Sequence, residues 1–445
     1  MYLFFKACEL YPIKNHPLNQ MTQGGGLLQL VAMGKQDVFL TGNPQITWFK
    51  MVYRRYTNFS TESSIIQFDN QADFGRRITT LIPRKGDLLG PMWLEIQLPA
   101  LTDSVTGKPV SYTNAIGHAL IQEITLEIGE QEIDKQTGEW MEIWSNHTVT
   151  QDKLQAWNNM IGKTTGASQG NTSSDSVNMY GPLYLYVPLR FWFCKNPGLA
   201  LPLIALQYHP VRINIILRPL QNLFVLTTGK VPCDTTVTSA SITSMRMYGD
   251  FVHLDVEERR RFVANSHEYL IEQVQYTPSQ SIDQTATTVQ IPMEFNHPIK
   301  ELFWVVQREA SANVNQPFNY TNLTVGELSS QVGYQNLITT ALLRLDGYDR
   351  FDIRNADYFR LVQPYQHHTV IPANDFIYSY SFALRPEDSQ PTGSMNASRI
   401  DTIVLQLEMN TTVVPARGPA SVRIYALNHN VLRITEGFGG ILFRI

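Results

Sequence analysis

The chain has 445 residues, a formal net charge of −4 and only 17% charged residues, against 43% hydrophobic ones. This weakly acidic balance argues against a protein that coats nucleic acid, because such a protein needs a basic surface. No run of about 18 apolar residues is present, so no transmembrane helix is predicted. The three scattered cysteines are too few for a disulfide framework or a zinc site, and we expect folding in a reducing compartment.

The N-terminal stretch is predicted to be an arm that carries a short helix. Residues 1–20 are interpreted as an extension that precedes an alternative start at Met21. Glycines 24–26 lack the lysine and the preceding strand of a phosphate-binding loop, so they are interpreted as a flexible lead into a helix. Within 25–40, helix-like spacing is shown by Leu27, Leu30, Val31 and Gly34.

The next segment, GNPQITWFKMVYRRYTNF over 42–59, is both aromatic and basic. Its aromatic side chains are predicted to start the first β-unit and to lie in its core at one end; they are Trp48, Phe49, Tyr53 and Tyr56. Its bases, Lys50, Arg54 and Arg55, are candidates for an interface, and the alternative is that they are merely solvated.

Most of the remaining chain has the period-two pattern of half-buried strands. ITLEI (124–128), VRINIIL (211–217) and IVLQLEM (403–409) each alternate apolar residues with others, and Gly, Pro and Asn interrupt such runs frequently. Helical spacing recurs only at GEWMEIWSNH (138–147) and DVEERRRFVA (255–264). The pattern is typical of antiparallel sheets in a sandwich or barrel.

The two halves of the chain resemble each other. The pairs are LEIGEQEID (126–134) with LRLDGYDRF (343–351), the stretch 183–215 with 377–409, and 92–101 with 301–310. All three pairs are offset by roughly 200 residues, which indicates two tandem copies of one β-unit. A unit of that size predicts an all-β fold of two tandem eight-stranded antiparallel jelly rolls, with short helices in the connecting loops.

The expected domain boundaries follow from this duplication. The arm comprises residues 1–46, the first jelly roll 47–255, a linker 256–265, and the second jelly roll 266–445. SMRMYGDFVHL before the linker reads as a last strand, and HEYLIEQVQY after it reads as a new first strand.

Two long polar stretches, 162–178 and 308–335, are predicted to be exposed loops, because such loops grow at the surface at little cost. They contain the candidate glycosylation positions Asn171, Asn319 and Asn322, each in an Asn-x-Ser/Thr sequence. Sugar contact through these loops is an alternative function.

No catalytic, cofactor-binding or metal-ligating residues are nominated. The adjacent His367 and His368 would face opposite sides of a strand, and no third ligand is evident. Asp255 and Glu257 are better interpreted as part of a solvated linker than as a glycosidase dyad. A β-sandwich glycosidase stays open as an alternative, because converging carboxylates on distant strands leave no pattern in one sequence.

Several long stretches together resemble one protein family. They are GGLLQLVAMGKQDVFLTGNPQITWFKMVYRRYTNFS, IGHALIQEITLEIGEQEIDKQTGEW, FWFCKNPGLALPLIALQYH, LDVEERRRFVANSHEYLIEQVQY, EFNHPIKELFWVVQ, YFRLVQPYQHHTVIP, YSFALRPEDSQPTGSMNASRID and ALNHNVLRITEGFGG. In this order they resemble the double jelly-roll major capsid protein of nucleocytoplasmic large DNA viruses, the iridovirus- and phycodnavirus-like group. The resemblance runs from about residue 24 to the C-terminus.

The resemblance implies a structural protein and no enzyme or cofactor. Three chains would form a pseudo-hexagonal homotrimer, and trimers would tile an icosahedral shell over an internal membrane, assembled in the host cytoplasm. The arm would lie at the inner face, where Lys50, Arg54 and Arg55 would meet the trimer, minor capsid proteins or the membrane. No direct sequence-specific nucleic-acid binding is expected. The alternative is a glycan-binding β-sandwich protein at the virion surface.

Overall fold

The computed structural model describes residues 25–104, 109–163, 181–225, 237, 240–324, 334–414 and 416–443. By its internal contacts the chain divides into two compact units, Met1–Tyr56 and Thr57–Ile445. Residues 47–56, which we expected at the start of the first jelly roll, therefore fall in the first unit. Among the described residues, no helix has the length and hydropathy needed to cross a bilayer.

The first unit contains two short helices, α1 (Gly25–Val31) and α2 (Lys35–Thr41). The helix predicted over 25–40 is thus confirmed, with an interruption at 32–34. The second helix begins after Gly34. The backbone N–H of Gly34 donates to Oδ2 of Asp37 at 2.9 Å, and this hydrogen bond caps the start of α2. Every described side chain of this unit is exposed.

The first half of the second unit contains two antiparallel sheets with four main strands each. One has the order β1 (Phe59–Ile66), β11 (Ser244–Leu254), β3 (Leu88–Leu98), β8 (Leu183–Pro188). The other has the order β2 (Arg77–Leu81), β9 (Val211–Leu217), β6 (Ile121–Ile128), β7 (Gln131–Thr137). A small third sheet consists of β10 (Phe224–Val225), β5 (Pro109–Tyr112) and β4 (Leu101–Thr102).

The second half repeats this arrangement. One sheet has the path β12 (His267–Tyr276), β22 (Ala420–Thr435), β15 (Pro298–Arg308), β19 (Tyr378–Ser381). The other has the path β14 (Thr288–Met293), β21 (Ile403–Met409), β16 (Ile338–Leu345), β17 (Tyr348–Asp349). Short strands pair beside these paths: β13 (Gln280–Ile282), β18 (Arg354–Asn355), β20 (Met395–Asn396) and β23 (Phe438–Ile441).

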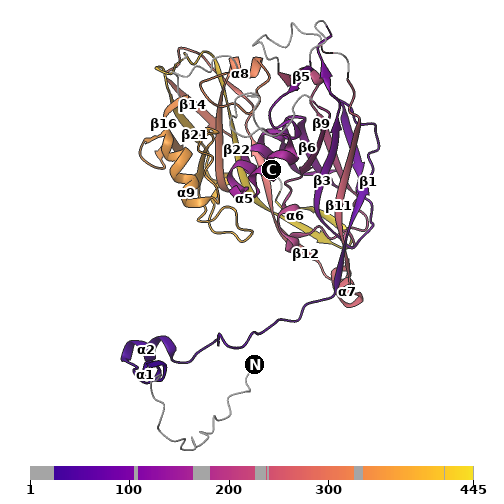
Figure 1. Ribbon diagram of the computed structural model, residues 1–445, viewed down its shortest axis with the longest axis vertical. Coiled ribbons are helices and arrows are strands. Elements are labelled where there is room, and N and C mark those ends of the chain that lie inside the picture. Colours follow the sequence, from indigo (N-terminus) through magenta and orange to yellow (C-terminus); the bar gives the residue numbers. More distant parts are fainter. Residues whose placement is uncertain are drawn as a thin grey trace, which may run out of the picture. The chain divides into compact units, whose positions relative to one another are not determined.

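The two halves share one strand connectivity. If β1, β2, β3 and β6 are matched to β12, β14, β15 and β16, and the later strands likewise, the sheet orders coincide. The similar sequence stretches occupy matching places: β3 matches β15, β6–β7 matches β16–β17, β8 matches β19, and β9 matches β21. The expected all-β fold of two tandem jelly rolls is confirmed, although short extra strands accompany the main ones. The two sets of sheets lie side by side in Figure 1.

The alternation seen in the sequence explains the sandwich packing. In β21, Ile403, Leu405, Leu407 and Met409 are buried, whereas the residues between them are partly or fully exposed. Strand β15 differs because its two faces enter different cores. Trp304 packs in the core of the second half, and Phe303 belongs to a larger cluster that extends into the first half. A strand covered on both faces loses the period-two pattern.

Helices occupy the connections. The predicted helices are confirmed as α4 (Gly138–Thr148) and α7 (Val256–Ala264). Thr137 caps α4 by accepting from the Trp140 N–H at 3.1 Å, and Asp255 caps α7. The others are α3 (Ile116–Ala119), α5 (Gln151–Ile161), α6 (Trp192–Lys195), α8 (Glu309–Asn313) and α9 (Gln363–His367), with η1 (Pro197–Leu199), η2 (Leu220–Asn222), η4 (Tyr358–Val362) and η5 (Ala397–Arg399).

The prediction of an exposed loop over 308–335 is wrong for residues 318–324, whereas Glu309, Ala310, Ala312, Asn313, Tyr334 and Gln335 are exposed. Residues 318–324 are all buried, because the segment turns inward and hydrogen-bonds to itself and to both halves. Of the predicted loop 162–178, only residues 162 and 163 are described, and the rest lies outside the described residues.

Candidate assembly sites: the seam between the halves and the arm

We call the boundary between the two jelly rolls the seam. Aromatic side chains of helix α4 fill part of it. The helix follows β7 of the first half, and its Trp140 ring lies 5.4 Å from Phe303 of β15 and 5.8 Å from Tyr425 of β22, centroid to centroid. Trp144 stacks on Trp140 at 5.7 Å. Edge-to-face and offset packing of this kind adds to the free energy gained from burial, so α4 fastens one half to the other.

A buried ion pair crosses the seam beside these rings. Nε and Nη2 of Arg423 on β22 each donate to one oxygen of Glu139 at 2.6 Å. The hydroxyls of Tyr425 and Tyr320 donate to the same carboxylate at 2.5 and 2.8 Å. Burial alone raises the pKa of Glu139, but attraction to Arg423 and the hydrogen bonds outweigh it, and the pKa lies below its usual value.

A second buried cluster surrounds His368, which follows α9. Its Nε2 lies 2.5 Å from Oε1 of Glu301 and its Nδ1 lies 3.0 Å from Oε1 of Glu387. Burial alone lowers the pKa of His368, but the two carboxylates outweigh it and raise the pKa to about 9. His147 of α4 packs against this imidazolium, 4.8 Å between ring centroids, and burial and the neighbouring charge hold its pKa well below the usual value.

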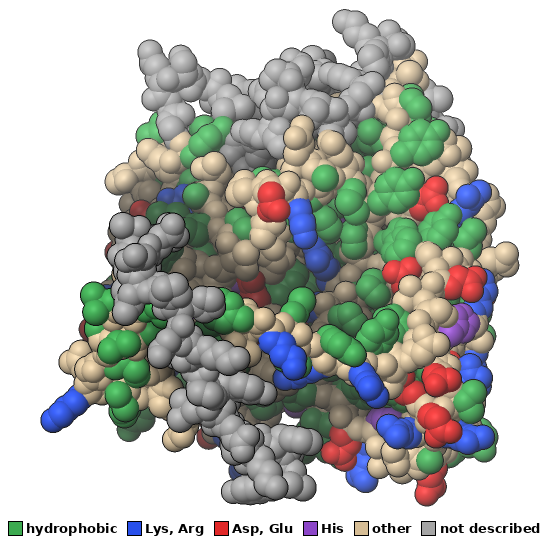
Figure 2. All heavy atoms as spheres, turned by 60° about the horizontal axis from the view of Figure 1, so that its bottom comes forward, with side chains coloured by type: hydrophobic (Ala, Val, Ile, Leu, Met, Phe, Trp, Pro, Cys, Tyr) green, Lys and Arg blue, Asp and Glu red, His purple; other side chains and the backbone are tan. Residues whose placement is uncertain are grey.

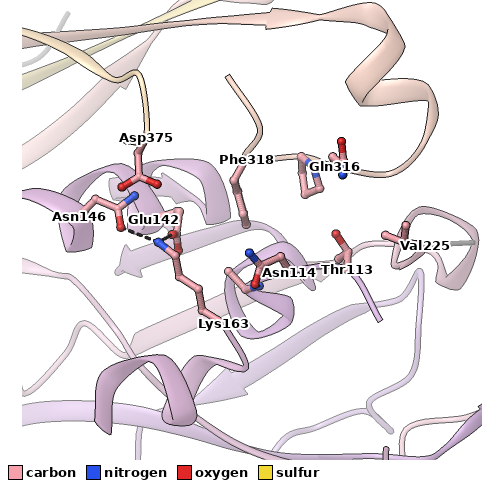
Figure 3. Close-up of a pocket in the computed structure, with 11 residues that line it drawn as sticks. Thr113, Asn114, Glu142, Asn146, Lys163, Val225, Gln316, Phe318 and Asp375 are labelled. Atoms are coloured by element: carbon pink, nitrogen blue, oxygen red, sulfur yellow. Dashed lines mark hydrogen bonds and ion pairs between the residues drawn. The ribbon is translucent and has the colours of Figure 1, made fainter. Parts of the chain in front are cut away.

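A small polar pocket lies further along the seam (Figure 3). Lys163 donates to Glu142 at 2.7 Å and to Asn146 at 2.8 Å, and Asp375 approaches from the second half. Burial raises the pKa of Glu142, but attraction to Lys163 and His118 reverses the shift and lowers it to about 2. The pocket has a volume of about 20 Å³, room for about one water molecule, so this part of the seam is closed rather than a ligand site.

A third ionic contact joins the halves near β12. Nζ of Lys195, from α6, lies 2.6 Å from Glu272, whose other oxygen binds Lys300. Tyr276 donates to Glu123 across the same boundary at 3.3 Å. The seam therefore joins two sandwiches into one block by charge pairs and aromatic packing. Among the described residues, no group of three His, Cys, Asp or Glu could hold a metal ion.

The predicted interface bases all lie in the first unit and are exposed; they are Lys50, Arg54 and Arg55. The prediction that the neighbouring aromatic side chains form core is wrong. The exposed fractions are 86% for Trp48, 98% for Phe49, 80% for Tyr53 and 84% for Tyr56. The segment belongs to the first unit and precedes the first strand, β1, which begins only at Phe59.

Two of the three candidate glycosylation positions are not at the surface, so the prediction that they are exposed is wrong. Asn319 and Asn322 are fully buried. The Asn319 amide donates to the carbonyl of Leu323 at 2.7 Å, and the Asn322 amide donates to that of Val414 at 2.7 Å. These asparagines are structural because they satisfy buried backbone groups. Asn171 lies outside the described residues.

Sequence reasoning missed the seam residues. Glu139 lies in a helix that was predicted, next to Trp140, yet nothing in a single sequence pairs it with Arg423, 284 positions away. The adjacent His367 and His368 were noticed, but their buried carboxylate partners were not. No local signal was available for Glu139, because consecutive helical residues point about 100° apart and an acid next to Trp140 can equally face solvent.

The face drawn in Figure 2 carries acidic and basic side chains interspersed, with hydrophobic groups between them. No broad field of one charge is visible among its coloured residues. Such a surface suits contacts with other proteins better than a uniform coat of nucleic acid.

Comparison with known proteins gives consistent matches. The family model described as "Major capsid protein N-terminus" matches residues 47–255, and "Large eukaryotic DNA virus major capsid protein" matches residues 258–440. The major capsid protein of Phaeocystis pouchetii virus is 38% identical, over 94% of this chain and 99% of that protein. Similar solved structures are PBCV-1 VP54, fitted into a reconstruction of the virophage Sputnik (32% identity, TM-score 0.75), and the PBCV-1 virus capsid (30%, 0.73); each match covers 90% of this chain and 100% of the other.

Proposed function

Because this chain belongs to the family of large eukaryotic DNA virus major capsid proteins, we propose that three copies of it form one pseudo-hexagonal capsomer. Its role is structural and it is not an enzyme. Its place is the capsid of a virion. The main support for the trimer is the internal duplication. Two sandwiches with the same strand connectivity lie side by side in each chain. Three such pairs around a threefold axis give six similar wedges, and closed symmetry is the usual way to join identical chains.

The domain division is part of the proposal. One jelly roll lies within 47–255, where its first strand β1 begins at Phe59, and the other lies within 266–445, with 256–265, which contain α7, linking them. Its support is that β1 to β11 pair only among themselves and that β12 to β23 do likewise in the described part of the chain. The seam turns the two wedges into one rigid tile.

The arm is proposed to lie at the inner face of the shell. Its support is the chemistry of residues 25–56: large apolar side chains are exposed beside Lys50, Arg54 and Arg55. An exposed apolar surface of this kind marks a contact with another molecule. The contacts that we propose are neighbouring chains, minor capsid proteins and the internal viral membrane, with assembly in the host cytoplasm.

The trimer is tested by the mass of the purified protein in solution. Light scattering should give a mass near three times 50.7 kDa. A monomer at all concentrations and salt conditions would refute the proposal.

The arm is tested by reversing its charges. The double variant Arg54→Glu, Arg55→Glu should form trimers but build shells poorly, because repulsion replaces attraction at the inner contacts. Arg260→Glu, which reverses an exposed cation on α7 outside the arm, is the matched control. Shells of the double variant that form as readily as wild type would remove these bases from the interface.

A further inference from the structure

A row of large side chains lies on the outer face of the sheet β1–β11–β3–β8. In this row Ile65 of β1 lies opposite Tyr248 of β11, and Tyr248 lies opposite Trp93 of β3, on which its ring stacks with 5.8 Å between centroids. The two rings point away from the core, because the residues before and after each of them along its strand are buried. Both rings are partly exposed and Ile65 is 42% exposed, so the described chain leaves this outer row open.

The second half has an equivalent row, and there the row is covered by the seam. Phe303 of β15 lies opposite Tyr425 of β22, which lies opposite Tyr276 of β12. Strands β3 and β15 match in connectivity, and Trp93 and Phe303 are each the sixth residue of an 11-residue strand. Phe303 and Tyr425 are buried because Trp140 of α4 packs on both rings. The first half thus has the same surface without the helix that covers it.

An arginine precedes the tyrosine by two positions in both rows. The sequence SVRIY in β22 and the sequence SMRMY in β11 make Arg246 the counterpart of Arg423. Arg423 binds Glu139 at the start of α4 across the seam. Arg246 is exposed and makes no ion pair or hydrogen bond with any residue that the structure describes, including Glu95, which lies opposite it on β3. Its guanidinium is therefore available to a carboxylate from another molecule.

The second half carries the counterpart of α4. We call residues 356–367, which include η4 and α9, the second-half helix. It follows β16, β17 and β18, as α4 follows β6 and β7. The sequences TGEW at 137–140 and NADY at 355–358 begin the two helices, and Thr137 and Asn355 each cap the first turn by accepting a backbone N–H.

The residues of the second-half helix that correspond to the seam contacts are open to solvent. Three side chains of α4 pack on Phe303 across the seam; they are Trp140, Trp144 and His147. The same spacing after the cap places Tyr358, Val362 and Tyr365 in the second-half helix. Val362 is 39% exposed, Tyr365 is 75% exposed and Tyr358 is partly exposed. This helix thus has the covering side chains of a seam and lacks a surface to cover.

Asp357 is the counterpart of Glu139 by the same alignment. Arg360 and Asn336 each donate to its Oδ1 at 2.8 Å. Its Oδ2 has no partner within the described part of the chain, and the side chain is 50% exposed. Oδ2 can therefore accept from a guanidinium of a second chain, as Glu139 accepts from Arg423.

The two open surfaces lie on opposite flanks of the body. Figure 1 shows β1, β3 and β11 at one side and α9 at the other. One chain cannot bring them together, so they meet only between chains. Such a contact joins unlike surfaces head to tail, and head-to-tail contacts close into a ring when the rotation allows it.

We propose that the second-half helix of one chain packs on the outer row of the next chain, with Asp357 bound to Arg246, so that the contact between chains repeats the seam within each chain. The partner is a second copy of this chain. Aromatic and arginine side chains at the centre of the contact are the types that dominate binding at protein interfaces. The inference rests on the proposed trimer and names the surfaces that hold it. A trimer held by other surfaces would overturn the inference alone.

The first test removes one ring from the outer row. Trp93→Ala should raise the protein concentration at which the trimer half-dissociates by at least about tenfold, measured by light scattering on dilution, because the ring is part of the contact. Trp48→Ala removes an exposed tryptophan from the arm and should dissociate like wild type. Unchanged dissociation of a Trp93→Ala protein that melts at the wild-type temperature would overturn the proposed contact.

The second test joins the two surfaces covalently. The double variant Tyr248→Cys, Tyr358→Cys is treated with a short bismaleimide at a concentration where light scattering shows trimers. Denaturing gels should show covalent trimers, because each chain is then linked to both of its neighbours. Wild type, which has three cysteines of its own, and each single variant give the background. Trimers of the double variant that cross-link no more than this background would overturn the contact and leave the trimer standing, whereas a monomeric wild type would overturn both.

Discussion

Glu139 and Arg423 show how single residues hold the seam. Both are largely buried, with side-chain exposures of 7% and 19%, so each would be costly without the other. Attraction between buried charges roughly offsets their loss of hydration, but removal of one partner leaves an uncompensated charge. The pair therefore stabilises the native arrangement of the halves by penalising every arrangement that separates them.

Replacing Arg423 by Met should lower the free energy of unfolding by about 3–5 kcal/mol, because Glu139 then stays buried without its cation. Urea denaturation followed by tryptophan fluorescence measures the change. The matched control is Asp349→Asn, which breaks the exposed pair with Arg344 and should cost about 1 kcal/mol or less. Equal effects of the two substitutions would contradict a special role for the seam pair.

His368 should make the protein less stable as the pH rises above neutrality. Its folded pKa of about 9 exceeds its unfolded value near 6.5. The stabilisation from a raised pKa is fully present below the unfolded pKa and is lost as the pH rises through the folded pKa. The window is therefore pH 6.5 to about 9.

The stability advantage of wild type over His368→Gln should shrink as the pH rises through this window, by on the order of 3 kcal/mol. Denaturation curves at a series of pH values provide the measurement. His253→Gln, at a partly exposed position near Glu62, should follow the wild-type profile. An advantage that is constant with pH would mean that His368 is not charged in the folded protein.

At the residue scale, sequence reasoning succeeded only where local pattern decides burial. Alternation identified the buried side of β21. It failed for Asn319 and Asn322, because polar composition indicates a loop but not whether its amides meet water or buried backbone groups. It failed for Trp48 and Phe49, because exposed aromatic residues in an arm have the same composition as aromatic residues in a core.

At the scale of elements, α4 is the piece that was predicted most completely. Its helical spacing over 138–147 was readable, since helix periodicity is local. Its partner was not, because β15 and β22 lie far along the chain. Local sequence therefore explains why this helix forms, whereas contacts with residues distant in sequence explain where it packs.

Trp140→Ala should destabilise the protein by about 3–5 kcal/mol, because the ring is buried against Phe303 and Tyr425 and its removal leaves a cavity. Thermal and chemical denaturation check this. Trp48→Ala removes the same side chain from an exposed position and should stay within about 0.5 kcal/mol of wild type. A comparable loss for Trp48→Ala would show that the arm packs on the folded body.

The arm is expected to be needed for shell assembly but not for folding. A chain that begins at Thr57 keeps every strand and every seam contact described above, so it should melt within a few degrees of the full-length protein. It should form capsomers but fail to build closed shells, because the proposed inner contacts are gone. Electron microscopy of assembly reactions and a melting curve give the two readouts. Shells built normally without residues 1–56 would contradict the role proposed for the arm.

At the scale of the whole molecule, the duplication was readable from sequence because it repeats long patterns at one offset, and repeated patterns indicate repeated folds. The two copies have the same sheet order, since similar patterns of buried and exposed residues fold in the same way. The relation between the copies was not readable. It depends on the seam, where contacts such as Trp140 with Phe303 and Lys195 with Glu272 join positions that no local pattern connects.

The duplicated chain should behave as one rigid tile with two similar wedges. Class averages from electron microscopy of the purified full-length protein test this most directly. The account predicts particles viewed down a threefold axis as near-hexagons, with six comparable lobes contributed by three chains. Particles with only three lobes, or isolated single chains at concentrations well above those used for assembly, would contradict it.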